Sequence, residues 1–392
     1  MQSKFKLTLG NRLVTFSALA LVVFGSLMIA SAEMGNSAGD TSYLTSVIIR
    51  QLLYAIAGII VYVFLVNVRV IRLNKYIYYV AYVFISGLLL STRLFGEIGG
   101  AYAWIVLGGG ATLQPSEFAK VFMIALAAKI FAKDMHENNI RNFFVYCALS
   151  ALYIFIIMFY QHDFGSGMVM FIICFCCAYL PAYKEYNKIH LCMLGMIAFA
   201  LAGLGLILSP AFNEFLKNYD SSYMIGRFLA ANDPFMYQFD IGYHVIMSLV
   251  SFANGGMIGL GYGNSIHKYM NFPNPSNDFI LPVIVEELGF VGFFILVLLY
   301  TLMLYPIVRG SLKVKRLSGK IIMLGVFIYF VIHFIFNVGG VGGLIPLTGV
   351  PLLMISSGGS SLMAALASLG LAQNELVTMK KAETDESNSG KV

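Results

Sequence analysis

Residues 13–29 read LVTFSALALVVFGSLMI, a nearly uninterrupted apolar run of the length needed to cross a membrane. The hydrocarbon core of a bilayer takes about 20 apolar residues in helical form, whereas the apolar core of a cleaved signal peptide has about 7–15. Although Ala30-Ser31-Ala32 resembles a signal-peptidase site, the length of the run favours a first transmembrane helix that is not cleaved.

Similar runs recur along nearly the whole chain, and the composition agrees with them. Of 392 residues, 59% are hydrophobic and 11% are charged, and the mean hydropathy is +0.81. Soluble domains are about 25% charged, so these values exclude a disordered chain and disfavour a soluble core. In lipid a helix satisfies its own backbone hydrogen bonds, and the sequence lacks the short alternating segments of a membrane barrel. The sequence therefore predicts an all-α polytopic integral membrane protein.

We predict about ten transmembrane helices in one domain, residues 1–379, followed by a short polar tail, residues 380–392, that we expect to be disordered. Lys and Arg set the orientation of such a chain. With a cytoplasmic N-terminus, 18 of the 25 basic residues fall on the cytoplasmic side, five fall outside and two lie within spans. Both termini are therefore predicted to be cytoplasmic. The predicted spans lie near residues 13–31, 49–67, 76–92, 115–132, 142–160, 165–181, 189–208, 280–305, 319–337 and 350–376.

This orientation places residues 209–279 in one long external loop between the seventh and eighth helices. Residues 242–260 of the loop are apolar, but their glycines weaken a helix, and an extra span would put the basic segment 309–320 outside. We interpret this part as an amphipathic or re-entrant element at the outer surface. Long ordered loops are usually functional.

Three classes of function find no support in the sequence. The net charge of +6 is small, and in a membrane protein excess Lys and Arg report orientation, so it does not indicate nucleic-acid binding. No G-x-x-x-x-G-K-[ST] loop occurs, so this chain is not expected to hydrolyse ATP. The five cysteines lie inside apolar runs without the spacing of zinc ligands, and we interpret them as buried or lipid-facing.

Charged residues inside apolar segments cost about 3 kcal/mol or more each, so they are the first candidates for function. In QPSEFAK, residues 114–120, Glu117 and Lys120 are three positions apart and share one helix face. They are predicted to form a pair inside the bundle, either as a structural ion pair or as part of a site. Gln114 or Ser116 is expected to help cap this helix.

Two further residues lie near predicted outer ends of helices. Asp163, in QHDFGSG at residues 161–167, either caps the following helix or takes part in a site. Arg227, in the external loop, is either a phosphate contact or a solvated loop residue.

A third group of candidates lies where the external loop meets the eighth helix. SNDFI, residues 276–280, places Asp278 at this junction, and Glu286 and Glu287 follow two turns later in apolar sequence. Three carboxylates this close can shift one another's pKa values, bind a divalent cation or act in acid–base chemistry. Helix capping by Asp278 is the alternative, but it leaves the paired glutamates unexplained.

The stretch FNVGGVGGLIPLTGVPLLMISSGGSS, residues 336–361, has seven glycines and two prolines at membrane depth. Broken backbone there is tolerated only beside protein or a water-filled cavity. The stretch therefore predicts an unwound start to the last helix that lines a cavity, with Ser360 as a supporting hydroxyl. Close helix packing by small residues is the alternative.

The order of these motifs resembles the SEDS family (shape, elongation, division and sporulation), which includes FtsW and RodA, over nearly the whole chain. Two departures are Asn277, where the family commonly has Thr, and LLMISSGGSS in place of LPFISYGGSS, which changes the detail of the cavity edge. The stretch GGVGGLIPLTGV is nearer to FtsW proteins, whereas TGVP followed by GGSS also suits RodA. The stretches that carry the resemblance are QPSEFAK, the Asp-Phe-Gly at 163–165, NGGMIGLG at 254–261, SNDFI with EELGFVG, and PLTGVP with GGSS.

The resemblance implies a peptidoglycan glycosyltransferase of the bacterial cytoplasmic membrane that polymerises lipid II into glycan strands at the outer face. It further implies a class B penicillin-binding protein as transpeptidase partner, together with other divisome or elongasome proteins. By motif, Asp278 matches the family's essential aspartate, and a divalent cation, Mg²⁺ or Mn²⁺, is expected with ligands unassigned. The candidates for substrate binding or support are Glu117, Lys120, Asp163, Arg227, Glu286, Glu287 and Ser360.

Two other functions stay open on the residue pattern alone. A transporter that flips lipid II would also have charges within its helices. Against it, no inverted repeat is evident, and the carboxylates gather at the outer face instead of the midplane. A noncatalytic scaffold for a transpeptidase is the third reading, and the sequence leaves division and elongation equally open.

Overall fold

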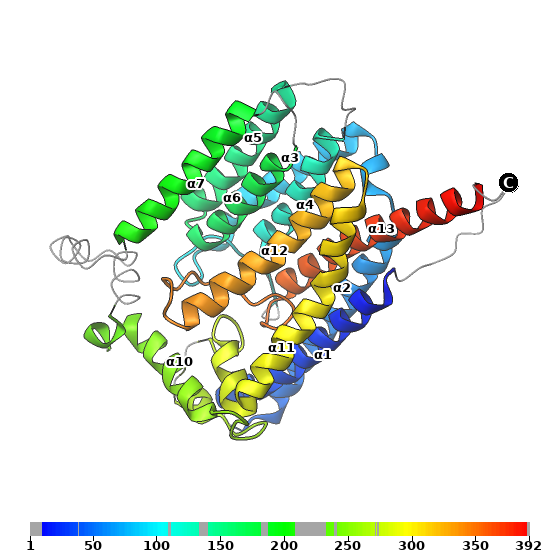
Figure 1. Cartoon of the computed structure of the whole chain (residues 1–392). Helices are drawn as coiled ribbons and strands as arrows, with labels where there is room; N and C mark the ends of the chain where they lie inside the picture. The colour runs from blue at the N-terminus through cyan, green and yellow to red at the C-terminus, as the bar shows by residue number, and fades with distance from the viewer. Residues whose placement is uncertain are drawn as a thin grey trace.

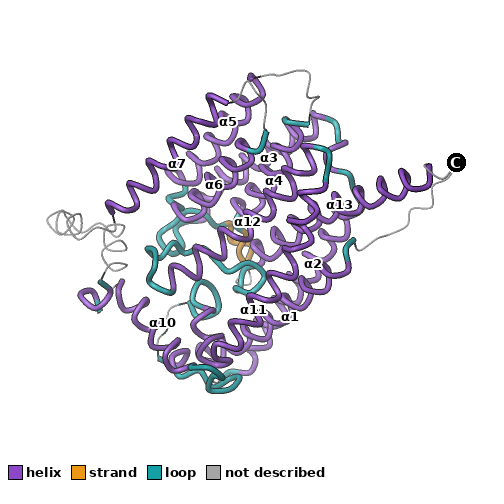
Figure 2. Tube along the Cα trace, viewed as in Figure 1, coloured by secondary structure: helices purple, strands orange, loops and turns teal. Residues whose placement is uncertain are grey.

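The computed structural model describes residues 10–37, 39–108, 111–132, 140–181, 187–207, 233–238, 241–270, 272 and 274–389. Most of these residues are helical, and the long helices pack into one bundle (Figures 1 and 2). Its helices are α1 (Arg12–Ser37), α2 (Thr41–Asn67), α3 (Lys75–Ser91), α4 (Pro115–Ile130), α5 (Ile140–Phe155), α6 (Phe164–Tyr179), α7 (Asn187–Ile207), α11 (Ile280–Lys313), α12 (Leu317–Val341) and α13 (Gly359–Ser389).

The predicted all-α membrane architecture is confirmed, and each predicted span overlaps one of these helices. Among the described residues, seven helical segments are long and apolar enough to cross a membrane. They are α1, α2, α3 with the turn that follows it (Lys75–Phe95), α5 with the turn that follows it (Ile140–Tyr160), α11, α12 and α13. The helix α6 and the first part of α7 are apolar but shorter. The count of ten spans and the cytoplasmic termini stay predictions.

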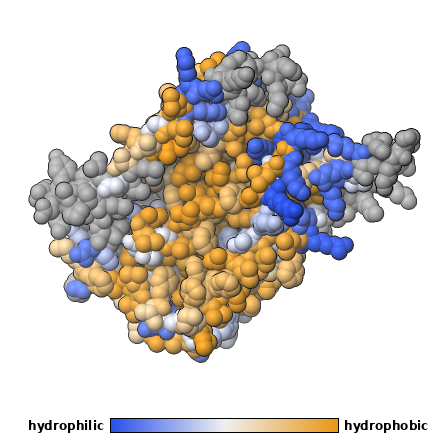
Figure 3. Space-filling model, in the orientation of Figure 1, coloured by the Kyte–Doolittle hydropathy of each residue, from blue (hydrophilic) through white to orange (hydrophobic). Residues whose placement is uncertain are grey.

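The outside of the bundle is apolar. Large side chains such as Phe64 and Phe84 leave more than 60% of their surface exposed. Figure 3 shows that hydrophobic residues cover most of one face, while hydrophilic residues gather near the projecting end of α13. A soluble protein seldom exposes so large an apolar surface, whereas lipid tails cover it without cost.

The last helix differs from its prediction at both ends. It begins at Gly359 instead of residue 350, because the segment before it is unwound, as its glycines and prolines predict. It then continues to Ser389, so the expected disorder after Met379 is wrong for the described part of the tail. Residues 380–386 include Lys, Ala and Glu, which favour helix, and Lys315 pairs with Glu386 at 3.2 Å.

The described part of the external loop includes one longer helix, α10 (Ile241–Gly255), which packs against α11 and α12. Its 15 residues fall short of the roughly 20 that a helical span needs. An ordered helical element is therefore confirmed, and its depth in the membrane stays a prediction. The described loop also holds two short 3₁₀ turns, η5 (Pro234–Tyr237) and η6 (His267–Tyr269).

A small β-hairpin was not predicted from the sequence. Strands β1 (Ile105–Gly108) and β2 (Ala111–Leu113) pair antiparallel just before α4. The strands are short and their glycine-rich connection hides the alternating pattern by which strands are recognised. The hairpin places Trp104 and Thr112 at the wall of a cavity.

Candidate active site

One large cavity, of about 1090 Å³, lies among the ends of several helices and loops. Residues from α1, α2 and α10, from the segments around β1 and β2, and from the starts of α6 and α13 line it. Three of the predicted site residues, Asp163, Asp278 and Ser360, share this lining. The unwound segment before α13 also borders it through Thr348, Gly349 and neighbouring residues, so the predicted cavity is confirmed.

Main-chain contacts hold the turn that carries Asp278 to two other elements. The Asn337 amide of α12 donates to the Asp278 carbonyl at 2.9 Å and to the Val350 carbonyl at 3.0 Å. Two residues before Asp278, the Ser276 carbonyl accepts from the backbone N–H of Ser357 at 2.7 Å. The half-buried Asp278 is therefore fixed between α12 and the start of α13.

A side-chain contact ties the same turn to α1, where the Ser276 hydroxyl donates to the carboxylate of Glu33. The alternative reading of Asp278 as a helix cap is wrong. The cap position of α11 is Phe279, which forms no side-chain capping bond. Asp278 lies at the cavity wall, where a carboxylate can act on a bound molecule.

Asp163 caps a helix and lines the cavity at the same time. Its Oδ1 accepts from the Ser166 N–H at 2.9 Å, which confirms the predicted cap of α6. Its Oδ2 accepts from the Gln114 amide at 2.9 Å, and the Gln114 backbone N–H donates to Ser360 Oγ at 2.8 Å. These bonds bring the starts of α4, α6 and α13 together at one wall.

The predicted caps of α4 are wrong. Gln114 occupies the cap position but forms no capping bond, because its side chain reaches Asp163 instead. The Ser116 hydroxyl is buried and has no hydrogen-bond partner within the described residues.

Glu117 and Lys120 form the predicted pair inside the bundle. Lys120 Nζ lies 2.7 Å from Glu117 Oε1, and both side chains are fully buried. The Tyr329 hydroxyl donates to Glu117 Oε2 at 3.0 Å, and His333 Nε2 lies 3.4 Å from the ammonium. The other ring nitrogen of His333 lies 3.2 Å from the carbonyl of Pro351, which borders the cavity. The pair therefore connects to the cavity wall without lining it.

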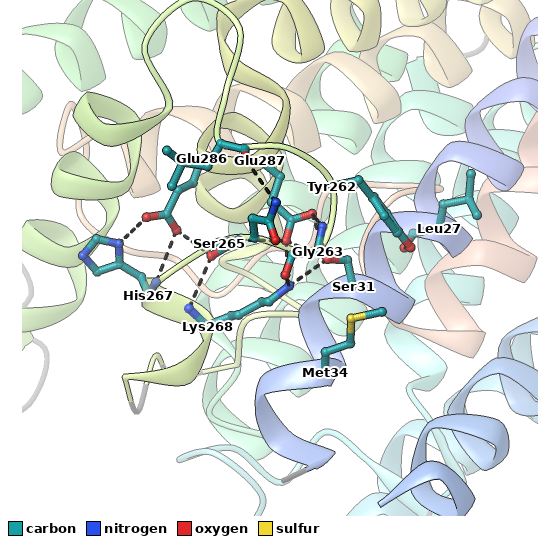
Figure 4. A network of polar contacts seen from close by, with 12 residues as sticks. Leu27, Ser31, Met34, Tyr262, Gly263, Ser265, His267, Lys268, Glu286 and Glu287 are labelled. Carbon is teal, nitrogen blue, oxygen red and sulfur yellow. Dashed lines mark hydrogen bonds and ion pairs between the residues drawn. The ribbon is translucent and has the colours of Figure 1, made fainter. Parts of the chain in front are cut away.

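The prediction that Asp278, Glu286 and Glu287 form one carboxylate cluster is wrong. Both glutamates are fully buried and enclosed by the external loop, away from the cavity lining (Figure 4). Glu286 Oε1 lies 2.6 Å from His267 Nδ1, and its other oxygen accepts from the Ser265 hydroxyl.

Glu287 has a partner of its own. Its Oε1 lies 2.8 Å from Lys268 Nζ, and it accepts from the Ser31 hydroxyl of α1 and from the Gly263 N–H at 3.0 Å. Buried charges need such partners, so the two glutamates fasten the loop to α11 and α1.

Backbone bonds complete this attachment. Gly289 interrupts α11 with φ +67°, and a Cβ there would collide with the backbone at Met257 to Gly259. Freed from the helical pattern, the Glu286 and Glu287 carbonyls accept from the N–H groups of Leu260 and Gly261, each at 2.9 Å. The stretches NGGMIGLG and EELGFVG, distant in sequence, therefore dock against each other.

Several cavity residues were missed or misread from the sequence. Glu33 and Arg50 line the cavity, and neither was among the candidates from the sequence. Trp104 lines it as well. His162, beside Asp163, lines it with φ +58°, an uncommon backbone conformation that draws attention to a residue only once a structure is known. Arg227 lies outside the described residues.

No group of three or more His, Cys, Asp or Glu side chains that could hold a metal ion occurs in the described part of the chain. The cavity does have carboxylates on separate elements, Glu33, Asp163 and Asp278. Mg²⁺ characteristically takes one or two carboxylates and completes its shell with water and substrate phosphates. The donor types present therefore fit a cation that binds together with a phosphorylated substrate.

Comparison with known proteins decides the family. A family model described as cell cycle protein, which covers FtsW, RodA and SpoVE, matches residues 11–381. The chain belongs to this family. Like other members of the FtsW/RodA/SpoVE family, it is a multi-pass protein of the cytoplasmic membrane.

Two relatives in Bacillus subtilis (strain 168) illustrate the similarity. Stage V sporulation protein E is 31% identical over 374 residues, which cover 94% of this chain and 97% of that protein. The probable peptidoglycan glycosyltransferase FtsW is 30% identical over 375 residues, covering 94% and 91%.

Solved structures agree with the fold. One, described as "Structural coordination of polymerization and crosslinking by a peptidoglycan synthase complex", is similar with a TM-score of 0.69 and 25% identity, covering 94% of this chain and 98% of that chain. The Thermus thermophilus rod shape determining protein RodA is similar in fold, with a TM-score of 0.58, 24% identity and coverage of 94% and 97%.

Proposed function

We propose that this protein is a peptidoglycan glycosyltransferase that polymerises lipid II into glycan strands at the outer face of the cytoplasmic membrane, in cell division or elongation. Relatives that carry this name match over nearly their whole length. The observation that carries the proposal is the position of Asp278, which lines a cavity of about 1090 Å³ and is held between α12 and the start of α13.

The chemistry needs a base at that position. A sugar hydroxyl of one substrate attacks the anomeric carbon of another, the bond from that carbon to the diphosphate breaks, and undecaprenyl diphosphate leaves with the electron pair. Asp278 accepts the hydroxyl proton, a contribution typically worth about 10²–10⁴-fold in rate. The wall formed by Asp163, Gln114 and Ser360 offers further polar groups for the sugars.

A divalent cation, Mg²⁺ or Mn²⁺, belongs to this proposal. Asp278 and Asp163 are the cavity carboxylates that would hold it together with the substrate, and it would supply positive charge for the leaving diphosphate. Lipid II, a class B penicillin-binding protein and other divisome or elongasome proteins are the proposed partners. The structural similarity to a peptidoglycan synthase complex supports the transpeptidase partner.

The test is glycan synthesis from lipid II by the purified protein with its transpeptidase in detergent, where no transport can be measured. Asp278→Asn should lower synthesis by about 10²–10⁴-fold while the protein stays folded. Asp233→Asn is the matched control, because Asp233 caps the exposed turn η5 and Asn caps about as well. Normal synthesis by Asp278→Asn would remove this residue from the reaction, and no synthesis by the wild type would favour a transporter or a scaffold.

A further inference from the structure

The described lining of the cavity has more acidic than basic side chains. Its described lining has three carboxylates, Glu33, Asp163 and Asp278, but a single Lys or Arg, Arg50 of α2. The buried lysines Lys120 and Lys268 lie outside the lining. A substrate with a diphosphate brings at least two negative charges into this cavity, and Arg50 is the protein cation that meets it there.

Arg50 is placed at the start of α13. Tyr54 follows it by four positions, so both side chains lie on one face of α2. The Tyr54 ring packs against Gly359, where an added Cβ would collide with ring atoms. Arg50, Tyr54 and Ser357 also line a smaller adjoining cavity of about 110 Å³.

The start of α13 adds to the positive potential. Its first residues, Gly359, Ser360 and Ser361, border the large cavity. The first N–H groups of a helix have no partner within it and carry partial positive charge. The guanidinium carries the full charge, and this helix end supplements it.

The arginine and the proposed base lie in adjoining parts of the site. Ser276, two residues before Asp278, contacts Glu33 through its hydroxyl and Ser357 through its carbonyl. Glu33 and Ser357 line the small cavity together with Arg50. One group can therefore act on the attacking hydroxyl while the other meets the diphosphate on the attacked carbon.

We propose that Arg50 binds the leaving diphosphate of the lipid-linked donor, an inference that rests on the proposed function. An arginine suits this task because its planar fork of N–H donors matches phosphate oxygens in pairs. The role makes Arg50 a binding residue of the donor side, distinct from the proton acceptor Asp278.

The experiment measures binding of undecaprenyl diphosphate to the detergent-purified full-length protein. Arg50→Gln should weaken binding about 10- to 100-fold, the effect of losing charge-assisted hydrogen bonds, and Arg50→Lys should recover part of it. Arg93→Gln is the matched control, since Arg93 is an exposed arginine outside the cavity lining that stacks on Tyr102 and Tyr160. Binding is measured in EDTA without an acceptor substrate, so the readout depends neither on proton transfer by Asp278 nor on a cation held by it. It therefore separates the Arg50 inference from the catalytic proposal.

Three results would overturn the inference. The first is unchanged binding by Arg50→Gln. The second is displacement of undecaprenyl diphosphate by phosphatidylglycerol as effectively as by inorganic pyrophosphate, which would indicate a site for anionic lipids in general. The third is full recovery in the double variant Glu33→Gln/Arg50→Gln, which would mean that Arg50 only balances the charge of Glu33. If Arg50→Gln fails to fold, as judged by its elution profile, Arg50→Lys is compared with wild type instead. Weaker binding of undecaprenyl diphosphate by Arg50→Lys supports the inference, and unchanged binding overturns it.

Discussion

Replacing Lys120 by methionine is expected to destabilise the protein by about 3–5 kcal/mol, the usual cost of removing one partner of a buried ion pair. The Lys120 ammonium lies 2.7 Å from Glu117, and neither side chain is exposed. Methionine roughly keeps the length of the side chain, so little of the loss comes from a cavity. Glu117 retains the hydrogen bond from Tyr329 but loses the cation that balances its charge.

Lys129→Met is the matched control, because Lys129 lies on the same helix but is only half-buried. Its ammonium donates to the carbonyls of Ile71 and Leu73 at 2.7 and 2.6 Å. Water can replace an ammonium at half-exposed carbonyls, so we expect a loss of about 1 kcal/mol. The free energy of unfolding is measured by SDS titration of the protein in mild detergent.

The double variant Glu117→Gln/Lys120→Met separates the charge effect from packing. It removes both charges, so it should be more stable than Lys120→Met alone, although two residues are changed. Equal losses of stability in Lys120→Met and Lys129→Met would refute a buried pair. So would a double variant whose loss equals the sum of the losses of Glu117→Gln and Lys120→Met. Glycan synthesis should follow the same order.

Three further predictions concern topology and the external loop. Reporter fusions at Lys315 and at residue 230 should report opposite sides of the membrane, and the same side for both would contradict the predicted orientation. Gly289→Ala should destabilise the protein by more than about 1 kcal/mol, because φ is +67° there, whereas Gly87→Ala, which meets no neighbouring atom, should not; thermal shifts measure both. Lys268→Met should cost about 3–5 kcal/mol by SDS titration, since it leaves a buried glutamate unbalanced, and a loss below 1 kcal/mol would contradict that pairing.

The sequence predicts the helices well because lipid imposes a simple rule on them. Apolar runs of sufficient length must be helical, and the spans found from them overlap the observed helices. Contacts between residues close in sequence can also be predicted. Glu117 and Lys120 share a helix turn, and Asp163 caps the helix that follows it. In each case the partner lies within four positions in the chain.

Contacts between distant segments could not be predicted in this way. Asp278 and Glu286 are eight positions apart, which suggested one cluster, yet the returning loop encloses the glutamate and leaves the aspartate at the cavity. Arg50 could not be predicted as a site residue either, because nothing near it in sequence indicates that α13 begins beside it. These arrangements depend on the path of the chain in space, which hydrophobic periodicity does not encode.

Burial and pairing sort the acidic residues of this protein into two groups. Glu117, Glu286 and Glu287 are fully buried, and each lies within 3 Å of a basic side chain, so exchanging a proton with substrate would mean disrupting a structural pair. The cavity carboxylates Asp163 and Asp278 are held in other ways. Asp163 is engaged as a helix cap, whereas Asp278 is positioned through its main-chain carbonyl on a turn fixed to two elements. The site therefore places Asp278 at its wall on a turn fixed to two elements, and this position favours Asp278 as the base.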